Sequence, residues 1–301
     1  MTIDGLAISI SGRLLRKAGV RDEPYECVRD AGAVIQKLKG RSDRPDLFTF
    51  VQDLTDREPR FSFYHELQTY AVLPVTTYDH WWKKQIHDKT RNLIRKAHKQ
   101  GVEIRSVPLN DDFVWGVKAI YDECPVRQGK PFKHYQKDHA TIKAELATFP
   151  DRSEFIGAFL GEELIGFAKL VTGNNVASFM HIISRIADRN KAPTNALVAR
   201  AVEVCADRQI PYLHYGVWSS GGLGMFKENH AFVPHPVPRY FVPLTWKGQV
   251  MLKLGLHRPW TEYVPETLRE HAVALRNRWN AFRYSQKAGK GAVAQLAERR
   301  G

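Results

Sequence analysis

The sequence has few cysteines and no long hydrophobic run. Only Cys27, Cys124 and Cys205 occur in 301 residues, widely spaced and without a C-x-x-C pair. This argues against a disulfide framework and a zinc site, so we expect no metal and a reducing, cytoplasmic compartment. No apolar run approaches the ~18 residues of a membrane-spanning helix. The first four residues carry an acid and no basic region, which does not indicate a secretory signal.

What the sequence has in excess is positive charge, with a formal net charge of +13. Residues 83–105 contain eight Lys or Arg and two acids, and residues 246–301 contain eleven and four. These two segments account for the whole excess. Basic surfaces attract phosphate groups on nucleic acid, nucleotides or anionic lipid. They also serve simply as solvated faces, and both interpretations stay open here.

Hydrophobic periodicity predicts alternating strands and helices. The expected strands cover residues 47–51, 70–75, 102–107, 154–160, 164–171, 176–184, 212–217 and 239–244. The expected helices cover residues 30–38, 80–100, 112–123, 138–148, 195–208, 225–232 and 266–283. In the 80–100 helix the apolar stripe is Ile86, Leu93, Ile94 and Ala97, and basic residues lie on the opposite face. Gly101 suits the left-handed residue that ends such a helix.

This element order predicts an α/β (α+β) fold. Residues 154–232 read as three strands, a helix, a strand and a short helix, the order that builds a splayed mixed sheet with an acyl-donor cleft in its middle. We expect residues 1–79 to form an N-terminal extension, for which a partial second sheet is one option. Residues 80–245 form the flanked sheet, and residues 246–301 form a basic, helical C-terminal extension.

Two short motifs carry a family resemblance. Thr90 to Val102 is similar to the basic helix before the transferase domain of FemABX proteins, and Phe226-Lys227 with Ala231-Phe232 resembles their phenylalanine-lysine motif. Over residues 80–245 the chain thus resembles the FemABX-like branch of the GNAT acyltransferase superfamily, which includes peptidoglycan-bridge aminoacyltransferases. The resemblance implies an N-acyltransferase that uses acyl-CoA or aminoacyl-tRNA as donor. The acceptor would be an amine on a small molecule or a lipid-linked compound.

The donor site implied by the resemblance departs from the GNAT pattern. GNAT enzymes that bind acyl-CoA carry Arg/Gln-x-x-Gly-x-Gly/Ala, whereas this chain has Arg189 followed by Ala192 and Thr194. Backbone N–H groups at the start of the next helix still suit a phosphate, although side chains crowd their approach. The expected donor-binding residues are Ile182, Ile183, Arg189, Ala192, Thr194, Asn195 and Phe226.

The chemistry needs a stabilised oxyanion and a neutral amine. Lys227 is the candidate for the first role, because a fixed cation there would face developing negative charge. Glu154, His181 and Tyr215 are candidates for amine deprotonation, each with a packing or strand-flanking role as the alternative, and water is another possible base.

Two further groups complete the expected site. The resemblance places acceptor binding at Arg127, Lys130, His134 and Tyr135, where a surface loop is the alternative. Contacts to phosphate or nucleic acid, tRNA included, are expected at Lys84, Arg91 and Arg95. A second hypothesis is a non-catalytic protein of this fold. It would hold nucleic acid or an anionic membrane surface, at the membrane periphery, through the basic helix and the C-terminus.

Overall fold

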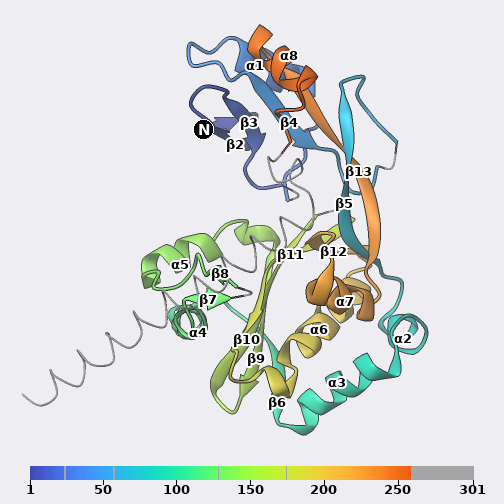
Figure 1. Ribbon diagram of the computed structural model, residues 1–301. Coiled ribbons are helices and arrows are strands. Elements are labelled where there is room, and N and C mark those ends of the chain that lie inside the picture. The colour runs from blue at the N-terminus through green and yellow to red at the C-terminus, as the bar shows by residue number, and fades with distance from the viewer. Residues whose placement is uncertain (24, 57, 128, 174, 259–301) are drawn as a thin grey trace, which may run out of the picture. The chain divides into compact units, whose positions relative to one another are not determined.

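The computed structural model describes residues 1–23, 25–56, 58–127, 129–173 and 175–258 (Figure 1). The chain forms two compact units, one of residues 1–109 and 146–257 and one that contains residues 110–145. The expected helix at 266–283 lies outside the described residues. No helix in the described part of the chain is both long and apolar enough to cross a membrane.

The larger unit is built on one mixed sheet. Within the described residues it has eleven strands. Their spatial order is β1 (Thr2–Ile3), β2 (Leu6–Ser11), β3 (Lys17–Val20), β4 (Leu47–Val51), β13 (Val233–Pro243), β5 (His65–Pro74), β12 (Tyr212–Val217), β11 (Val176–Ser184), β10 (Glu163–Thr172), β9 (Ser153–Leu160) and β6 (Val102–Val107). The expected mixed sheet is therefore confirmed.

The first 79 residues share this sheet with the rest of the chain. Strand β5 lies between β12 and β13 and is antiparallel to both. Strand β13 pairs in turn with β4. Strands β3 and β4 are parallel and are connected through helix α1 (Ala31–Lys39). The N-terminal strands thus continue the sheet that carries the motifs.

Helices cover the sheet. Helix α6 (Pro193–Asp207) packs on β9, β10, β11 and β12, with α3 (Asp88–Lys99) beside it (Figure 1). Helix α7 (Gly221–Asn229) follows β12, and α8 (Trp246–Lys253) follows β13. The core under α6 contains Leu197, Val202, Ala168 and Leu213, all fully buried. The smaller unit contains α4 (Asp111–Asp122), the strand pair β7 (Val126–Arg127) and β8 (Lys130–Pro131), and most of α5 (His139–Leu146).

The expected helix at 80–100 is broken in the structure. It consists of α2 (Tyr78–His80), a π-helical turn at Trp81–Gln85, and α3. Ile86 separates the last two with an extended backbone, φ −96° and ψ 150°, and its side chain is buried. The Arg91 guanidinium donates to the carbonyls of Trp82 (2.6 Å) and Ile86 (2.7 Å), which the break leaves outside a regular helix. Burial of Ile86 and this cap therefore override the local helical pattern.

The sheet parts between β11 and β12. These parallel strands pair only at Val176, Ala177 and Ser178 of β11, opposite Tyr212, Leu213 and His214. Met180 is an extra residue of β11 relative to β10, and Gly216 (φ 68°) lies in a register shift of β12 against β5. Bulges bend a strand and increase its twist. A bulge on each strand just past the last pair accounts for the splay.

Candidate functional site

Lys227 lies where β12 ends beside the split. Its side chain is 2 % exposed, and its ammonium donates a hydrogen bond to the Val217 carbonyl at 2.7 Å. The same nitrogen lies 5.2 Å from the centre of the Tyr215 ring. Burial lowers the pKa of Lys227 from its ordinary value. Nζ makes no other hydrogen bond to the residues that the structure describes, so two of its three N–H groups stay available.

The phenylalanine-lysine motif folds around Tyr215. Its ring contacts those of Phe179 (5.0 Å between centroids), Phe232 (5.6 Å) and Phe226 (6.3 Å). The C-terminus of α7 supports this arrangement, because Phe232 N–H donates to the Lys227 carbonyl at 3.1 Å. Burial raises the pKa of the Tyr215 phenol well above its ordinary value. The phenol therefore stays protonated near neutral pH and suits a donor better than a base.

Glu154 lies apart from this cluster, whereas His181 lies on β11, two residues after Phe179. Glu154 is on β9, three strands from β12, or about 14 Å at the usual strand spacing. Its carboxylate binds Arg208 and accepts from Ser106. His181 pairs with Lys169 of β10, and its ring lies 6.2 Å from that of Phe167. The structure thus groups Lys227 with Tyr215 and gives no contact that joins Glu154 to them.

The expected donor residues lie at the split and at the start of α6. Ile182 and Ile183 pair with β10, beyond the point where pairing with β12 stops. Ala192 has the left-handed backbone usual for glycine, φ 57°, and α6 then begins at Pro193. Among the described residues, no side chain caps this helix N-terminus. Ser184 and Thr194 share a hydrogen bond of 2.9 Å, which ties α6 to the end of β11.

The remaining residues of this turn differ in exposure. Arg189 is exposed in a short 3₁₀ helix (Arg189–Lys191), and Asn195 N–H bonds back to the Ala192 carbonyl at 3.1 Å. Ala192 is buried, and Thr194 is half-buried. The backbone thus has the conformation that the missing glycine would supply, with a methyl group added.

The expected acceptor residues lie in the smaller unit. Arg127 donates to the Ile120 carbonyl (2.9 Å) and to Glu123 (3.0 Å). His134 is buried, and burial lowers its pKa to about 4. Lys130 is exposed and Tyr135 is half-buried. Arg127 therefore has structural partners within its own unit.

The three expected phosphate contacts are not equivalent. Lys84 and Arg95 are exposed, and the Arg95 guanidinium lies 5.5 Å from the centre of a Trp82 ring. Arg91 is half-buried and binds Asp88 at 2.7 Å as well as the two carbonyls at the helix break. Arg91 thus stabilises the break, whereas Lys84 and Arg95 face solvent.

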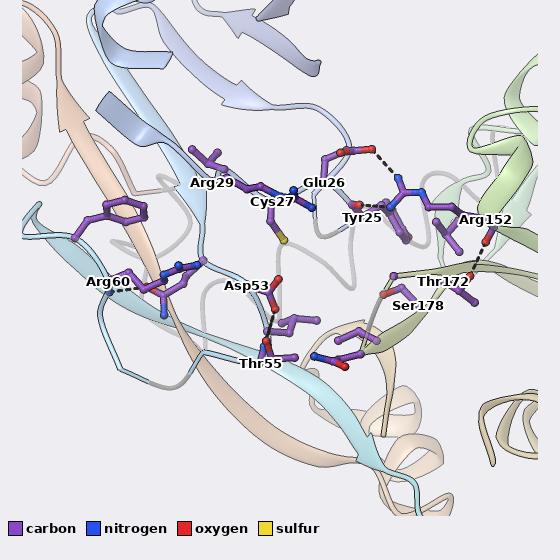
Figure 2. A pocket seen from close by; sticks show the side chains of 18 residues that line it. Tyr25, Glu26, Cys27, Arg29, Asp53, Thr55, Arg60, Arg152, Thr172 and Ser178 are labelled. Atoms are coloured by element: carbon purple, nitrogen blue, oxygen red, sulfur yellow. Dashed lines mark hydrogen bonds and ion pairs between the residues drawn. The ribbon is translucent and has the colours of Figure 1, made fainter. Parts of the chain in front are cut away.

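A polar pocket of about 720 Å³ lies elsewhere in the larger unit, and the sequence did not indicate it (Figure 2). Its wall comes from the loop before α1, the loop after β4, and the turn between β10 and β11. Residues labelled in Figure 2 include Tyr25, Glu26, Cys27, Arg29, Asp53, Thr55, Arg60, Arg152, Thr172 and Ser178. Most of them come from loops, where no periodic pattern marks a common face.

Charges of both signs line this pocket. Arg152 binds Glu26 at 2.7 Å, and Asp53 accepts from the hydroxyl and N–H of Thr55 (2.7 and 2.9 Å). Burial, with the neighbouring Asp53, raises the pKa of the Cys27 thiol to about 12. This thiol therefore stays protonated near neutral pH and is not an activated nucleophile.

The pocket and the Lys227 cluster lie on opposite faces of β11. Ser178 lines the pocket, whereas the ring of the next residue, Phe179, packs on Tyr215. Successive side chains of a strand point to opposite faces. The phenol of Tyr25, in the pocket wall, donates to the Phe179 carbonyl at 3.1 Å. Side chains on both faces of the sheet thus contact β11 at the start of the split.

One buried histidine connects with the pocket wall. His214 Nδ1 lies 3.2 Å from Ser178 Oγ, and burial, then the charge of Lys227, lower the His214 pKa to about 3. The imidazole is therefore neutral. Among the described residues, no group of three or more His, Cys, Asp or Glu side chains is placed to hold a metal ion.

Comparisons with known proteins identify the fold. No protein-family model and no curated protein matches the sequence. Among solved structures, FemX is similar over 84% of this chain and 88% of its own, with 10% identity and a TM-score of 0.57. The chain has a FemX-like fold. The expected GNAT-type, FemABX-like architecture is therefore confirmed.

Two further structures share the FemX-like fold. One is the C-terminal domain of a putative lysylphosphatidylglycerol synthetase from Agrobacterium fabrum (13% identity, TM-score 0.56, 82% of this chain and 83% of that one). The other is L-PGS from Bacillus licheniformis (15% identity, TM-score 0.52, 79% and 81%). At these identities the likeness establishes the fold alone.

Proposed function

We propose that the protein is an N-acyltransferase that moves an acyl or aminoacyl group from acyl-CoA or charged tRNA to an amine. The observation that carries this proposal is the buried Lys227 ammonium beside the parted strands β11 and β12. A carbonyl placed at the split would lie within reach of the two N–H groups of Nζ that have no partner among the described residues.

In the proposed reaction, a neutral amine attacks the donor carbonyl, and an N–C bond forms. The carbonyl π electrons move to oxygen, and the Lys227 ammonium stabilises that oxyanion. When the oxyanion collapses, the C–S bond of a thioester or the C–O bond of an aminoacyl ester breaks. The amine gives up its proton to solvent or to the leaving sulfur or oxygen. Lys227 acts by charge and hydrogen bonding and need not lose its own proton.

The N-terminus of α6 supports the donor side of the proposal. Uncapped N–H groups near Thr194 and the helix dipole favour a phosphate. The exposed Arg189, which precedes α6 in the sequence, adds positive charge. For a tRNA donor, the exposed Lys84 and Arg95 of the basic helix add more.

The acceptor is proposed to enter from the other face of β11. The pocket of Figure 2 lies on that face and is large enough for a small molecule or the head of a lipid-linked compound. This face is also the one from which an amine could approach a donor held on the α6 side. The loop with Arg127, Lys130, His134 and Tyr135 is a second proposed acceptor element.

The test is a donor panel. Mass spectrometry of the purified protein would first detect co-bound coenzyme A. Acetyl-CoA, longer acyl-CoAs and charged tRNAs would then be offered with mixed amine acceptors, with a Lys227→Met variant beside the wild type. Transfer that depends on Lys227 supports the proposal. Failure of every donor, together with tight, salt-sensitive binding of uncharged RNA, supports instead the non-catalytic, nucleic-acid-binding function.

A further inference from the structure

Helix α8 exposes an apolar stripe. Trp246 is 71% exposed and Leu254, at its C-terminal end, is 64% exposed, with Val250 between them also exposed. Residues four apart are offset by only about 40° around a helix, so the three side chains form one row. Leu256 extends the exposed apolar surface past the helix. An apolar row of this kind turned to solvent marks an interaction surface.

The opposite side of α8 is fixed to the sheet. Gly248 and Met251 are buried, and a Cβ on Gly248 would lie 1.9 Å from the Asp46 carbonyl oxygen. The Thr245 hydroxyl caps the helix by accepting from Gly248 N–H at 3.2 Å and donates to Asp46 at 2.7 Å. Met251 also packs with Phe241 of β13. The helix is therefore held in one orientation, and the apolar row is not a core face that has turned outward.

Positive charge flanks the apolar row on both sides. At about 100° per residue, Lys247 and Lys253 fall on either edge of the row formed by Trp246, Val250 and Leu254. Both lysines are exposed, and residues 244–258 contain no acid. Long lysine side chains can lie along an apolar surface while they keep their ammonium groups in a polar layer.

A neighbouring loop adds to this surface. The backbone N–H of Arg16 donates to the Asp46 carboxylate at 2.8 Å, the same carboxylate that holds Thr245. Just before it in sequence, Leu14 is 87% exposed and Arg13 is exposed. Leu15 packs in the same cluster as Met251 of α8. The loop and α8 thus lie together and have the same composition of leucine and basic residues.

We propose that α8 and the loop at 12–16 form a surface that docks on an anionic lipid bilayer. Exposed Trp and Leu would enter the region between headgroups and acyl chains, and Arg13, Lys247 and Lys253 would meet lipid phosphates. The charge favours this occupant, because Arg13, Lys247 and Lys253 are exposed cations, the nearby Asp43 carboxylate is paired with Arg16, and a bilayer of anionic lipid presents the opposite charge over the whole surface. The proposal does not rest on acyl transfer.

The test is co-sedimentation of the full chain with vesicles. Vesicles of phosphatidylglycerol mixed with phosphatidylcholine are compared with pure phosphatidylcholine, over a series of salt concentrations. The wild type is expected to bind only the anionic vesicles. Trp246→Glu with Leu254→Glu should reduce the partition coefficient by at least about tenfold, because the apolar contribution is lost. Lys247→Glu with Lys253→Glu should reduce it and flatten its salt dependence.

Two controls separate this surface from others. Lys84→Glu with Arg95→Glu, on the basic helix, should leave vesicle binding near the wild-type value. Brominated phosphatidylglycerol should quench tryptophan fluorescence in the wild type and less so in Trp246→Phe. Thermal melting checks that each variant folds.

Three results would overturn the proposal. One is wild-type protein that ignores anionic vesicles, or α8 variants that bind them as well as the wild type. Another is a dimer by light scattering that Trp246→Glu dissolves, which would make a second copy the occupant. The third is a photo-crosslinker at position 246 that captures residues 259–301 of the same chain instead of lipid.

Discussion

The Lys227 ammonium donates a hydrogen bond to the carbonyl of Val217, the last residue of β12, at 2.7 Å. This bond fixes a cation at the edge of the split instead of in bulk solvent. We therefore expect Lys227→Met to lower turnover by ~10²-fold or more, since the oxyanion loses its stabilising charge. The methionine retains most of the buried apolar length, so the melting temperature should stay near that of the wild type.

The matched control is Lys89→Met, a lysine exposed on α3. Its turnover should equal the wild-type value. Turnover of Lys227→Met that is also unchanged would remove Lys227 from the proposed mechanism.

A second prediction separates stability from donor binding at α6. Thr194→Asp places a carboxylate in the first turn of a helix, which favours the helix by about 0.3–1 kcal/mol, and the carboxylate can accept from the Ser184 hydroxyl in place of the Thr194 hydroxyl. The same charge repels a phosphate, so donor affinity should fall on the order of tenfold. Calorimetry of donor binding and thermal melting measure the two effects. Ala33→Asp, in the first turn of α1, is the control and should leave donor affinity unchanged.

The basic helix supplies a third prediction. Lys84→Glu with Arg95→Glu should weaken binding of charged tRNA and reduce the slope of log affinity against log salt by about 2, if each contacts one phosphate. Arg91→Met should act differently, because its guanidinium caps two carbonyls at the helix break. It should lower the unfolding free energy by about 1–2 kcal/mol. Equal salt slopes for the wild type and the double variant would show that Lys84 and Arg95 contact solvent and not the phosphates of tRNA.

His230 leads to a prediction about acid. Its Nδ1–H donates to the Phe226 carbonyl (2.7 Å), and burial lowers its pKa to about 4. The unfolded chain protonates near pH 6.5, so stability present above that pH is lost as the pH falls toward 4. Denaturant titrations should show that the free energy of unfolding falls between pH 7 and pH 4.5. The fall should be about 2 kcal/mol smaller in His230→Gln than in the wild type. An equal fall in both proteins would contradict the assignment.

Lys169 gives a pH dependence of the same direction in an alkaline range. It is fully buried, and its ammonium donates to the carbonyls of Leu146 (2.8 Å) and Thr148 (2.6 Å). Burial lowers its pKa from 10.5 to about 8. Between these values the folded protein releases a proton that the unfolded chain keeps, so this group makes the folded state more stable as the pH rises.

The comparison with Lys169→Met isolates that contribution. The unfolding free energy of the wild type minus that of the variant should increase from pH 8 to 10.5 and stay constant below pH 7. A difference independent of pH over the whole range would show that the lysine titrates normally in the folded state.

Local pattern was enough to predict much of the sheet. The predicted strands at 102–107, 176–184 and 212–217 coincide with β6, β11 and β12. Their apolar residues face buried surfaces, so the hydrophobic pattern of each segment matches its burial in the folded sheet. In the structure, Phe226 and Phe232 of the phenylalanine-lysine motif pack on Tyr215, a contact that the motif by itself did not predict.

What the sequence could not indicate depends on distant parts of the chain. The helix break at Ile86 depends on the burial of that residue in the core, where the neighbouring Trp81 is also buried and donates to the distant His230 carbonyl at 3.1 Å. The predicted short helix at 225–232 runs instead from Gly221 to Asn229, because three glycines among residues 221–224 hide the helical pattern. The polar pocket joins Tyr25 to Ser178, and no local periodicity records that proximity.

The position of β13 bears on how the protein is made. This strand, near residue 240, is the shared neighbour of β4 and β5, which leave the ribosome some 170 to 190 residues earlier. Until then both strands have open edges that invite pairing with other nascent chains. Synthesis of this protein should therefore depend on chaperones until β13 has left the ribosome, and the first 79 residues expressed alone should aggregate.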